Sequence, residues 1–286
     1  MRTATLSRVL YRKPLLRLGS LLSLPLLWLV IAYLGSLAAM FLTAFWTVDA
    51  FTGNPVPGFS LGNFGSLFSD PTYLAVAARS LGVAAGVTVI DAIIALPLAF
   101  FMAKVASPRA QRFLVAAVLT PLWASYLVKA YAWRVMLGGS GVLDWMIGGG
   151  SQSYYGLTAT TVTLAYLWLP YMILPVYAGL ERIPNSLIEA SSDLGASAWR
   201  TFRSVILPLL FPAVVAGSIF TFSLTLGDYI TVKIVGGKSQ LFANVIYDNV
   251  VTADNLPFAA AAGLFPVAVM VIYLAAVRRS GALDNL

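Results

Sequence analysis

Two carboxylates next to apolar residues are the groups of this sequence best placed to do chemistry. Asp91 lies well inside the apolar run 75–102, and Asp228, followed by Tyr229, lies at the end of another apolar run. A carboxylate in lipid costs about 2.5–3.5 kcal/mol unless it is paired or faces a cavity. Asp91 is therefore a functional candidate, and its alternative role is a hydrogen bond to a Ser, Thr or Lys of a neighbouring helix. Asp228 and Tyr229 are candidates for the mouth of a pathway, and the alternative for Asp228 is an ordinary interfacial carboxylate.

Three aromatic residues fall at helical spacing on one face of the apolar run 113–136. For the two deeper ones, Trp123 and Tyr126, we expect rings that line a pathway and offer cation–π faces to an ammonium group. Trp133 fits packing or an outer aromatic belt instead. Lys129 lies in the same run and counts against a pathway that attracts cations only.

The elements that must position these residues are membrane helices. Hydrophobic residues make up 59% of the 286 residues, charged residues 10%, and the mean hydropathy is +0.85. In soluble domains about a quarter of the residues are charged. The sequence has no cysteine and no histidine, which excludes disulfides, thiol and histidine catalysis and the commonest soft metal ligands. We therefore predict an all-α integral membrane protein with no catalytic residue, metal or cofactor of its own.

Apolar runs of about 20 residues predict the spans of such a protein. We place six, at 21–46, 75–102, 113–136, 157–180, 206–226 and 258–277. Most of the 18 basic residues then fall at the two ends of the chain and in the two inner loops, so the positive-inside rule predicts that both termini are cytoplasmic. The net charge of +7 is a topology signal and predicts no nucleic-acid partner. Residues 1–20 would form a cytoplasmic segment and residues 21–286 a single transmembrane domain.

Two outer segments have the spacing of short helices. Glycine-rich stretches bracket Val142–Ile147, which is too short to span a bilayer and apolar enough to lie at its surface. The connection after Asp228 contains Leu241–Val251, which also has helical spacing. We expect a short outer helix from each.

The polar segment at about 182–205 predicts an elbow of two short amphipathic helices. Gly195 supplies the left-handed residue that ends the first helix, and the second begins near Ser197. Ser186 followed by Glu189 fits a capping box. The cap and a docking role are both open for Glu189, and they are compatible.

Asp193 is disfavoured where it stands. It is a like charge four residues from Glu189 and lies at the negative end of the first elbow helix. We therefore expect a basic partner, either Arg200 or Arg203 of this chain or a residue of another protein.

The elbow also has a specific pattern. Glu189-Ala190-Ser191 is followed after three residues by Gly195, after nine more by Val205, and after one more by Leu207-Pro208. This resembles the EAA loop of binding-protein-dependent ABC importer permeases, with Ser191 for the second Ala and Val205 for Ile. In that family the loop is a coupling helix that sits in a cleft of the cytoplasmic ATPase. The resemblance implies a type I ABC importer (MetI-like) permease fold with six transmembrane helices, and it implies an ATPase-coupling role for Glu189, Ala190, Asp193, Gly195 and Ala196.

Further segments, Pro121–Trp133 and Leu226–Tyr229 followed by Val235–Gly237, resemble the B-type permease of the spermidine/putrescine branch. The resemblance covers nearly the whole chain after residue 70 and implies polyamine import, although importers of iron, opines and small amino acids share related segments. The partners it implies are a second permease, an ATP-binding cassette ATPase dimer and an extracytoplasmic solute-binding protein, in the lipid bilayer of a bacterial inner membrane.

Two other classes of protein fit less well. An ion-coupled secondary transporter should show buried carboxylates in paired, discontinuous helices, and only Asp91 qualifies. An intramembrane enzyme needs paired catalytic groups, and no such pair is found. Gly236-Gly237-Lys238-Ser239 resembles the end of a P-loop, but Val232 stands where that motif requires glycine, so we expect another chain to hydrolyse ATP.

Overall fold

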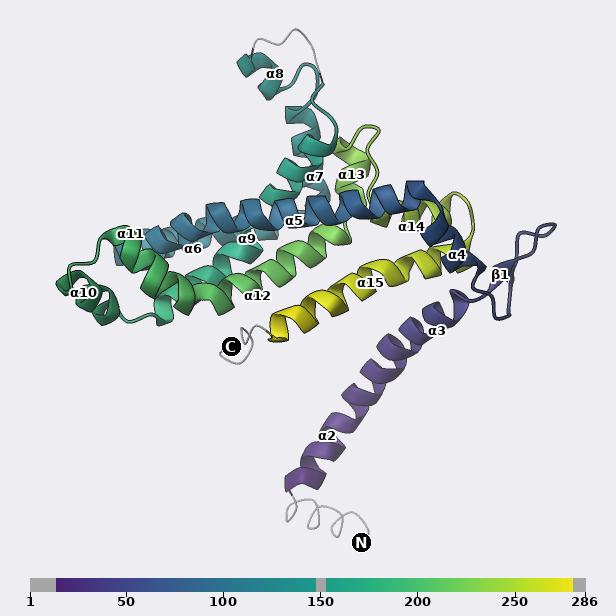
Figure 1. The fold of residues 1–286 in the computed structure, drawn as a ribbon, viewed down its shortest axis with the longest axis horizontal. Coiled ribbons are helices and arrows are strands. Elements are labelled where there is room, and N and C mark those ends of the chain that lie inside the picture. Colours follow the sequence, from purple (N-terminus) through teal and green to yellow (C-terminus); the bar gives the residue numbers. More distant parts are fainter. Residues whose placement is uncertain (1–13, 148–152, 280–286) are drawn as a thin grey trace.

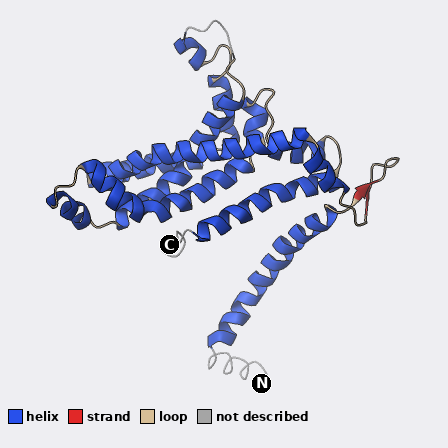
Figure 2. Cartoon of the chain, in the orientation of Figure 1, coloured by secondary structure: helices blue, strands red, loops and turns tan. Residues whose placement is uncertain are grey.

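The computed structural model describes residues 14–147 and 153–279 and consists almost entirely of helices (Figures 1 and 2). Within these residues five helices are long and apolar enough to cross a membrane, and a bent pair of helices adds a sixth span. The five cover Leu21–Thr43, Pro71–Val105, Leu157–Arg182, Ala198–Leu226 and Leu256–Arg278. These spans agree with the predicted ones, since in lipid only helices or closed barrels satisfy all backbone hydrogen bonds.

The first span packs against the bundle at its outer end and diverges from it toward the N-terminus (Figure 1). It consists of α2 (Pro14–Leu29), the π-helical turn η1 (Val30–Leu34) and α3 (Gly35–Thr43). No residue of Leu21–Thr43 is buried within the chain, and Figure 1 shows the helix diverging from the neighbouring α15 (Leu256–Arg279). Residues 1–13 of the predicted cytoplasmic segment lie outside the described residues.

An outer hairpin follows the first span. Strands β1 (Thr47–Val48) and β2 (Pro55–Val56) pair antiparallel and are drawn red in Figure 2. Asp49 accepts hydrogen bonds from the backbone N–H groups of Phe51 and Thr52 at 3.0 and 2.8 Å, and Gly53 has a φ of +70°. Helix α4 (Gly62–Ser69) then leads into the second span.

Three long helices form the core and lie side by side (Figure 1): α5 (Pro71–Phe100), α9 (Leu157–Arg182) and α12 (Leu207–Leu226). Helix α5 begins at an N-cap, because Asp70 accepts a hydrogen bond from the backbone N–H of Thr72 at 2.7 Å. It ends in a π-helical turn, η2 (Phe101–Val105). Buried residues of all three helices make one apolar cluster near the elbow.

Two glycines let α9 and α12 approach closely. A Cβ on Gly217 of α12 would lie 2.6 Å from Sδ and 3.1 Å from Cα of Met172, and a Cβ on Gly179 of α9 would lie 2.6 Å from Cβ of Ala213. Small residues permit such contacts between membrane helices, where dispersion replaces the hydrophobic effect as the source of packing energy. Helices α9 and α12 are therefore in close contact at two positions along their length, Gly179 and Gly217.

The third span is bent, which contradicts the prediction of one continuous helix over 113–136. Helix α6 (Pro108–Trp123) and helix α7 (Tyr126–Met136) meet at 93°. Ala124 and Ser125 between them have extended backbone, and Pro121 removes a donor from the last turn of α6. Figure 1 shows α7 leaving the bundle sideways and carrying α8 (Val142–Ile147), the predicted short outer helix, at its far end.

The remaining helices belong to the elbow and the outer end. The elbow contains α10 (Asn185–Asp193), α11 (Ala198–Thr201) and the π-helical turn η3 (Phe202–Ile206), which runs directly into α12. After α12 come α13 (Ile230–Val235) and α14 (Phe242–Val251). Helix α14 is the outer helix predicted from Leu241–Val251, whereas α13 was not predicted.

The close contact of α9 with α12 can be tested with a matched pair of variants. Gly217→Val places a side chain against Met172, whereas Gly82→Val on α5 adds one where a Cβ meets nothing within 4 Å. Overpacking costs about 1–3 kcal/mol, so we expect Gly217→Val to lower the thermal unfolding midpoint of the detergent-purified protein by several degrees more than Gly82→Val. Equal midpoints for the two variants would contradict the packing described here.

Candidate functional site

The elbow between α9 and α12 has the predicted geometry. Helix α10 is 9 residues long and ends before Gly195, which has a φ of +77°. Ser197 caps the next helix by accepting a hydrogen bond from the backbone N–H of Arg200 at 3.4 Å. Glycine adopts positive φ without the steric cost that a Cβ brings, so the reversal of the chain depends on Gly195.

The predicted capping box at the start of α10 is wrong. The helix begins at Asn185 with Pro184 as its N-cap residue, and no side chain makes a capping hydrogen bond. Ser186 therefore lies inside the first turn, where it cannot act as the N-cap. Glu189 remains exposed on the helix surface, and of the two roles considered for it the docking role remains.

The acidic edge of the elbow is unpaired within the described chain. Glu189 and Asp193 are both exposed, and neither carboxylate forms an ion pair or a hydrogen bond with another described residue. The predicted partners within this chain, Arg200 and Arg203, are not in ion-pair contact with Asp193. Of the two explanations for Asp193, a basic residue of another protein is the one that stays open.

The elbow also exposes apolar side chains. Leu194 is 89% exposed and Trp199 is 69% exposed, with the ring of Trp199 stacked 5.8 Å from that of Phe202. Exposed large apolar residues beside unpaired charges are typical of a surface that binds another protein. Ala190 is exposed on α10 as well, whereas Ala196 is half-buried and its N–H donates to the carbonyl of Ser191 at 3.1 Å.

One further hydrogen bond joins the two halves of the elbow. The hydroxyls of Ser191 and Thr201 are 2.9 Å apart and join α10 to α11 across the turn at Gly195. Thr201 is buried. Ser191 is one of the two departures from the EAA pattern, and here it supplies the hydroxyl that an alanine would lack.

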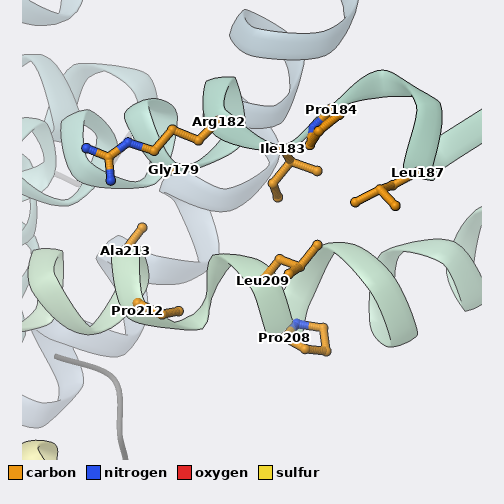
Figure 3. Close-up of a pocket in the computed structure, with 9 residues that line it drawn as sticks. All are labelled: Gly179, Arg182, Ile183, Pro184, Leu187, Pro208, Leu209, Pro212 and Ala213. Atoms are coloured by element: carbon orange, nitrogen blue, oxygen red, sulfur yellow. The ribbon is translucent and has the colours of Figure 1, made fainter. Parts of the chain in front are cut away.

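A groove of about 400 Å³ lies beside the elbow (Figure 3). Its two walls are the end of α9 with the start of α10, and the first turns of α12. The side chains are mainly apolar, with Arg182 at one end, and the lining residues are Gly179, Arg182, Ile183, Pro184, Leu187, Pro208, Leu209, Pro212 and Ala213.

A second polar cluster lies at the outer end of the bundle. The hydroxyl of Tyr126 donates a short hydrogen bond to Oδ2 of Asp228 and lies 2.6 Å from the hydroxyl of Thr231. Oδ1 of Asp228 accepts from the backbone N–H of Thr231 at 2.8 Å. Asp228 is only 8% exposed. The cluster joins the start of α7 to α13, and it does so because the bend after Trp123 brings Tyr126 to that point.

The predicted shared face of Trp123, Tyr126 and Trp133 does not exist, since the 93° bend separates the first from the other two. Trp123 is 89% exposed at the end of α6. The ring of Trp133 lies 5.5 Å from that of Tyr166, so its expected packing role is confirmed. Tyr229 stacks on Tyr247 at 4.6 Å and belongs to the contact of α13 with α14.

An aromatic row continues inward from Tyr126 and was missed from the sequence. The ring of Trp168 stacks 5.9 Å from that of Tyr126, Tyr171 lies 5.9 Å from Trp168, and Phe220 lies 6.3 Å from Tyr171. The row crosses from α7 over α9 to α12. The spacing of Trp168 and Tyr171, three residues apart on one helix face, was the available signal.

Asp91 lies on the side of α5 that faces the bundle and is completely buried. Both of its carboxylate oxygens lack a hydrogen-bond partner in the described chain, so the alternative of a bond to Ser, Thr or Lys is not observed. On the same helix, the hydroxyl of Thr88 accepts a hydrogen bond from that of Thr221 of α12 at 3.3 Å. The structure therefore brings Asp228 and Tyr126 together and leaves Trp123 and Asp91 apart from them.

The described geometry agrees with a family model. The family described as "Binding-protein-dependent transport system inner membrane component" matches residues 95–280, which include the elbow and the outer cluster. The chain belongs to this family. The predicted ABC importer permease and its inner-membrane location are confirmed by this match together with the relatives described next.

Relatives of this permease agree with the assignment. The chain is 43% identical to the inner membrane ABC transporter permease protein YdcU of Escherichia coli (strain K12), over 96% of this chain and 93% of that protein. It is 33% identical to the spermidine/putrescine transport system permease protein PotB of Haemophilus influenzae, over 79% of this chain and 81% of that protein.

Solved structures share the fold of this permease. A chain of a bacterial alginate ABC transporter in complex with an alginate pentasaccharide-bound periplasmic protein has a TM-score of 0.73 at 15% identity, with 97% of both chains covered. A chain of the inward-facing MetNI methionine ABC transporter has a TM-score of 0.59 at 18% identity, with 76% of this chain and 99% of that chain covered. At such identities the likeness shows the fold, and the predicted type I importer fold is confirmed.

The hydrogen bond between Tyr126 and Asp228 can be measured with a double-mutant cycle. A hydrogen bond in a site that excludes water contributes about 1–2 kcal/mol, so Tyr126→Phe and Asp228→Asn should couple by that amount in the unfolding free energy of the permease. Tyr131→Phe is the control, because Tyr131 is 54% exposed and should add to Asp228→Asn independently. If Tyr126→Phe were as additive with Asp228→Asn as Tyr131→Phe is, Tyr126 and Asp228 would not interact.

Proposed function

We propose that this permease imports polyamines of the putrescine and spermidine type. Its partners in this proposal are a second permease, an ATP-binding cassette ATPase dimer on the cytoplasmic side and a solute-binding protein on the outer side. The permease itself makes no covalent change to its substrate. A second permease that is either a homologue or a copy of this chain satisfies the proposal.

The observation that carries the substrate class is the outer cluster of Asp228 and Tyr126 with the aromatic row behind it. A polyamine carries two or more ammonium groups, which need carboxylates or aromatic faces when they leave water. Asp228 stands where the row begins, and Trp168, Tyr171 and Phe220 continue from it toward α12. The relative from Haemophilus influenzae, named for spermidine and putrescine, supports the same class.

Asp91, Trp123 and Tyr229 belong to the proposed pathway in different ways. Asp91 is buried without a partner, and an ionised carboxylate in that position is costly, so a cation that enters when the helices separate would stabilise it. Trp123 presents an almost fully exposed ring at the bend. Tyr229 packs on Tyr247 and holds the outer helices in place behind Asp228.

The basic residues near this pathway are mostly engaged elsewhere. Lys233 forms an ion pair with Asp248 at 2.7 Å and lies 3.8 Å above the ring of Tyr247. Arg134 donates to the carbonyl of Ile234 at 2.8 Å. Because these positive charges are held by other groups, they oppose a cationic substrate less than their number suggests.

The coupling role rests on the elbow. Glu189, Asp193 and the exposed Leu194 and Trp199 offer a surface with unpaired acidic groups and apolar side chains. A basic cleft of the ATPase would satisfy both. When the ATPase dimer closes, the elbow would carry the movement to α9 and α12, to which it is joined by the chain itself, and the pathway would open alternately to each side.

Uptake into proteoliposomes tests the substrate class. The purified importer with its binding protein should accumulate radiolabelled putrescine or spermidine in the presence of ATP. Asp228→Asn and Trp123→Ala should each lower uptake about tenfold, which corresponds to about 1.4 kcal/mol, while the ATPase remains bound. Asp254→Asn and Trp145→Ala are the matched controls, since both residues are exposed and lie away from the cluster.

Two results would contradict the substrate proposal. Parental rates of polyamine uptake in both Asp228→Asn and Trp123→Ala would show that these residues do not recognise the cation. An importer that hydrolyses ATP in response to its binding protein but accumulates no polyamine would favour an anionic or zwitterionic solute, which Lys129 could contact.

A further inference from the structure

Lys104 connects the elbow to a helix with which the elbow has no direct chain connection. It lies in η2, the π-helical turn that ends α5. Its ammonium group donates to the carbonyl of Ile183 at 2.6 Å and to Oδ1 of Asn185 at 3.0 Å. Ile183 is the C-cap residue of α9, and Asn185 is the first residue of α10. One side chain of the α5 turn therefore holds both sides of the junction at Pro184.

The position suits a lysine for two physical reasons. The last carbonyls of a helix lack partners within the helix and carry its partial negative charge. The ammonium group of Lys104 supplies a hydrogen-bond donor to the carbonyl of Ile183 and a positive charge at this end of α9. A hydrogen bond from a charged donor is also about twice as strong as a neutral one. A neutral side chain in place of Lys104 would lose both bonds at once.

A second contact fastens the same region. Nε2 of Gln111, in the first turn of α6, lies 2.7 Å from the hydroxyl of Tyr177 and 2.8 Å from Oε1 of Glu181. The hydroxyl of Tyr177 donates to the same oxygen of Glu181 at 2.5 Å. The first turn of α6 therefore binds the last turns of α9 through Gln111. Lys104 makes the next contact along the chain, at the start of the elbow.

The other end of the elbow is fastened to the same core. Ile206, at the end of η3, packs in one buried cluster with Ile183 and with Met102 of η2. The turn at Gly195 between the two ends is closed by the bond of Ser191 with Thr201. A displacement of α10 can therefore reach three helices: α9 and α12 through the chain, and α5 through the packing of Met102 and the hydrogen bonds of Lys104. π-Helical turns such as η2 are frequent at functional sites.

We propose that Lys104 is a positioning residue for energy coupling, which makes α5 move with the elbow when the ATPase displaces it. The proposal rests on the coupling role of the elbow proposed above. Helix α5 carries Asp91 on its buried face, so the bond at Lys104 links the ATPase side to the carboxylate in the middle of the bundle.

The test measures solute moved per ATP hydrolysed by the complete importer in proteoliposomes, with putrescine as the probe. Lys104→Met should lower this ratio about tenfold, the scale set by the loss of a charged hydrogen bond, while the ATPase still co-purifies. Lys104→Arg, which keeps the charge and the donors, should restore most of the ratio. Arg109→Met is the control, because Arg109 is an exposed basic residue in the first turn of α6, five positions from Lys104.

A purely structural role gives a different result. If Lys104 only caps α9, Lys104→Met lowers the unfolding midpoint and leaves the ratio unchanged, which overturns the proposal. If Lys104→Met fails to accumulate in the membrane, Asn185→Ala replaces it, since it removes one of the two acceptors and leaves Ile183 capped. A smaller fall in the ratio for Asn185→Ala supports the proposal, and a parental ratio overturns it.

The same assay separates this inference from the proposals on which it stands. If the parental importer shows ATP hydrolysis stimulated by its binding protein but no putrescine uptake, only the polyamine assignment fails. Stimulation by the binding protein, carrying the solute with which it purifies, then replaces the ratio as the readout for Lys104. If the ATPase neither binds the permease nor responds to the binding protein, the coupling role of the elbow fails and the role of Lys104 fails with it.

Discussion

The close approach of α9 and α12 is the constraint on which the rest of the permease depends. Gly179 and Gly217 bring the two backbones so near that a single added Cβ would meet a neighbouring side chain at 2.6 Å. Because interiors packed this tightly do not deform continuously, the two helices behave as one body. The elbow joins their inner ends, and the bond between Ser191 and Thr201 closes it. A force on the elbow is therefore delivered to the helix pair as a whole.

Two clusters of polar side chains lie at the two ends of that body. At the inner end the elbow leaves Glu189 and Asp193 unpaired and exposed, which favours a partner outside the chain. At the outer end Asp228 is almost fully enclosed by Tyr126 and Thr231. The first arrangement suits docking, and the second suits a site that opens only when helices move. Asp91 lies between them on α5, buried and without a partner.

Local features were predictable from the sequence, and contacts distant along the chain were not. The turn at Gly195 and the cap at Ser197 depend on residues beside them, and both are observed. The bend after Trp123 was not predicted, because the apolar pattern continues through it without a break. Pro121 was the available signal. The pairing of Tyr126 with Asp228 depends on that bend and on residues 102 positions apart. The spans followed from hydropathy alone, since lipid leaves the backbone few alternatives.

The capping box is the one detail of the elbow that its spacing predicts wrongly. Ser186 and Glu189 have the correct spacing, yet the N-cap residue is Pro184 and the helix starts at Asn185, two residues before the start that a cap at Ser186 would give. Pro184 disfavours a helical conformation at Ile183, which ends α9 there. Lys104, 81 positions from Asn185, donates to Asn185 and to the carbonyl of Ile183 at this junction. The elbow was therefore predicted correctly from the residues, whereas the cap of α10 was predicted incorrectly.

The most direct test of the elbow as the coupling element is the effect of Gly195→Val on ATPase binding and transport. A Cβ on Gly195 would meet nothing within 4 Å, so the substitution acts only through the backbone, at a cost of about 1 kcal/mol or more for positive φ. Gly53→Val is the matched control, because Gly53 has a φ of +70° and equally open surroundings in the outer hairpin. We expect Gly195→Val to insert normally but to lose the ATPase on co-purification and to lose transport, whereas Gly53→Val retains the ATPase. Normal transport by Gly195→Val, with the ATPase still bound and stimulated, would contradict the account.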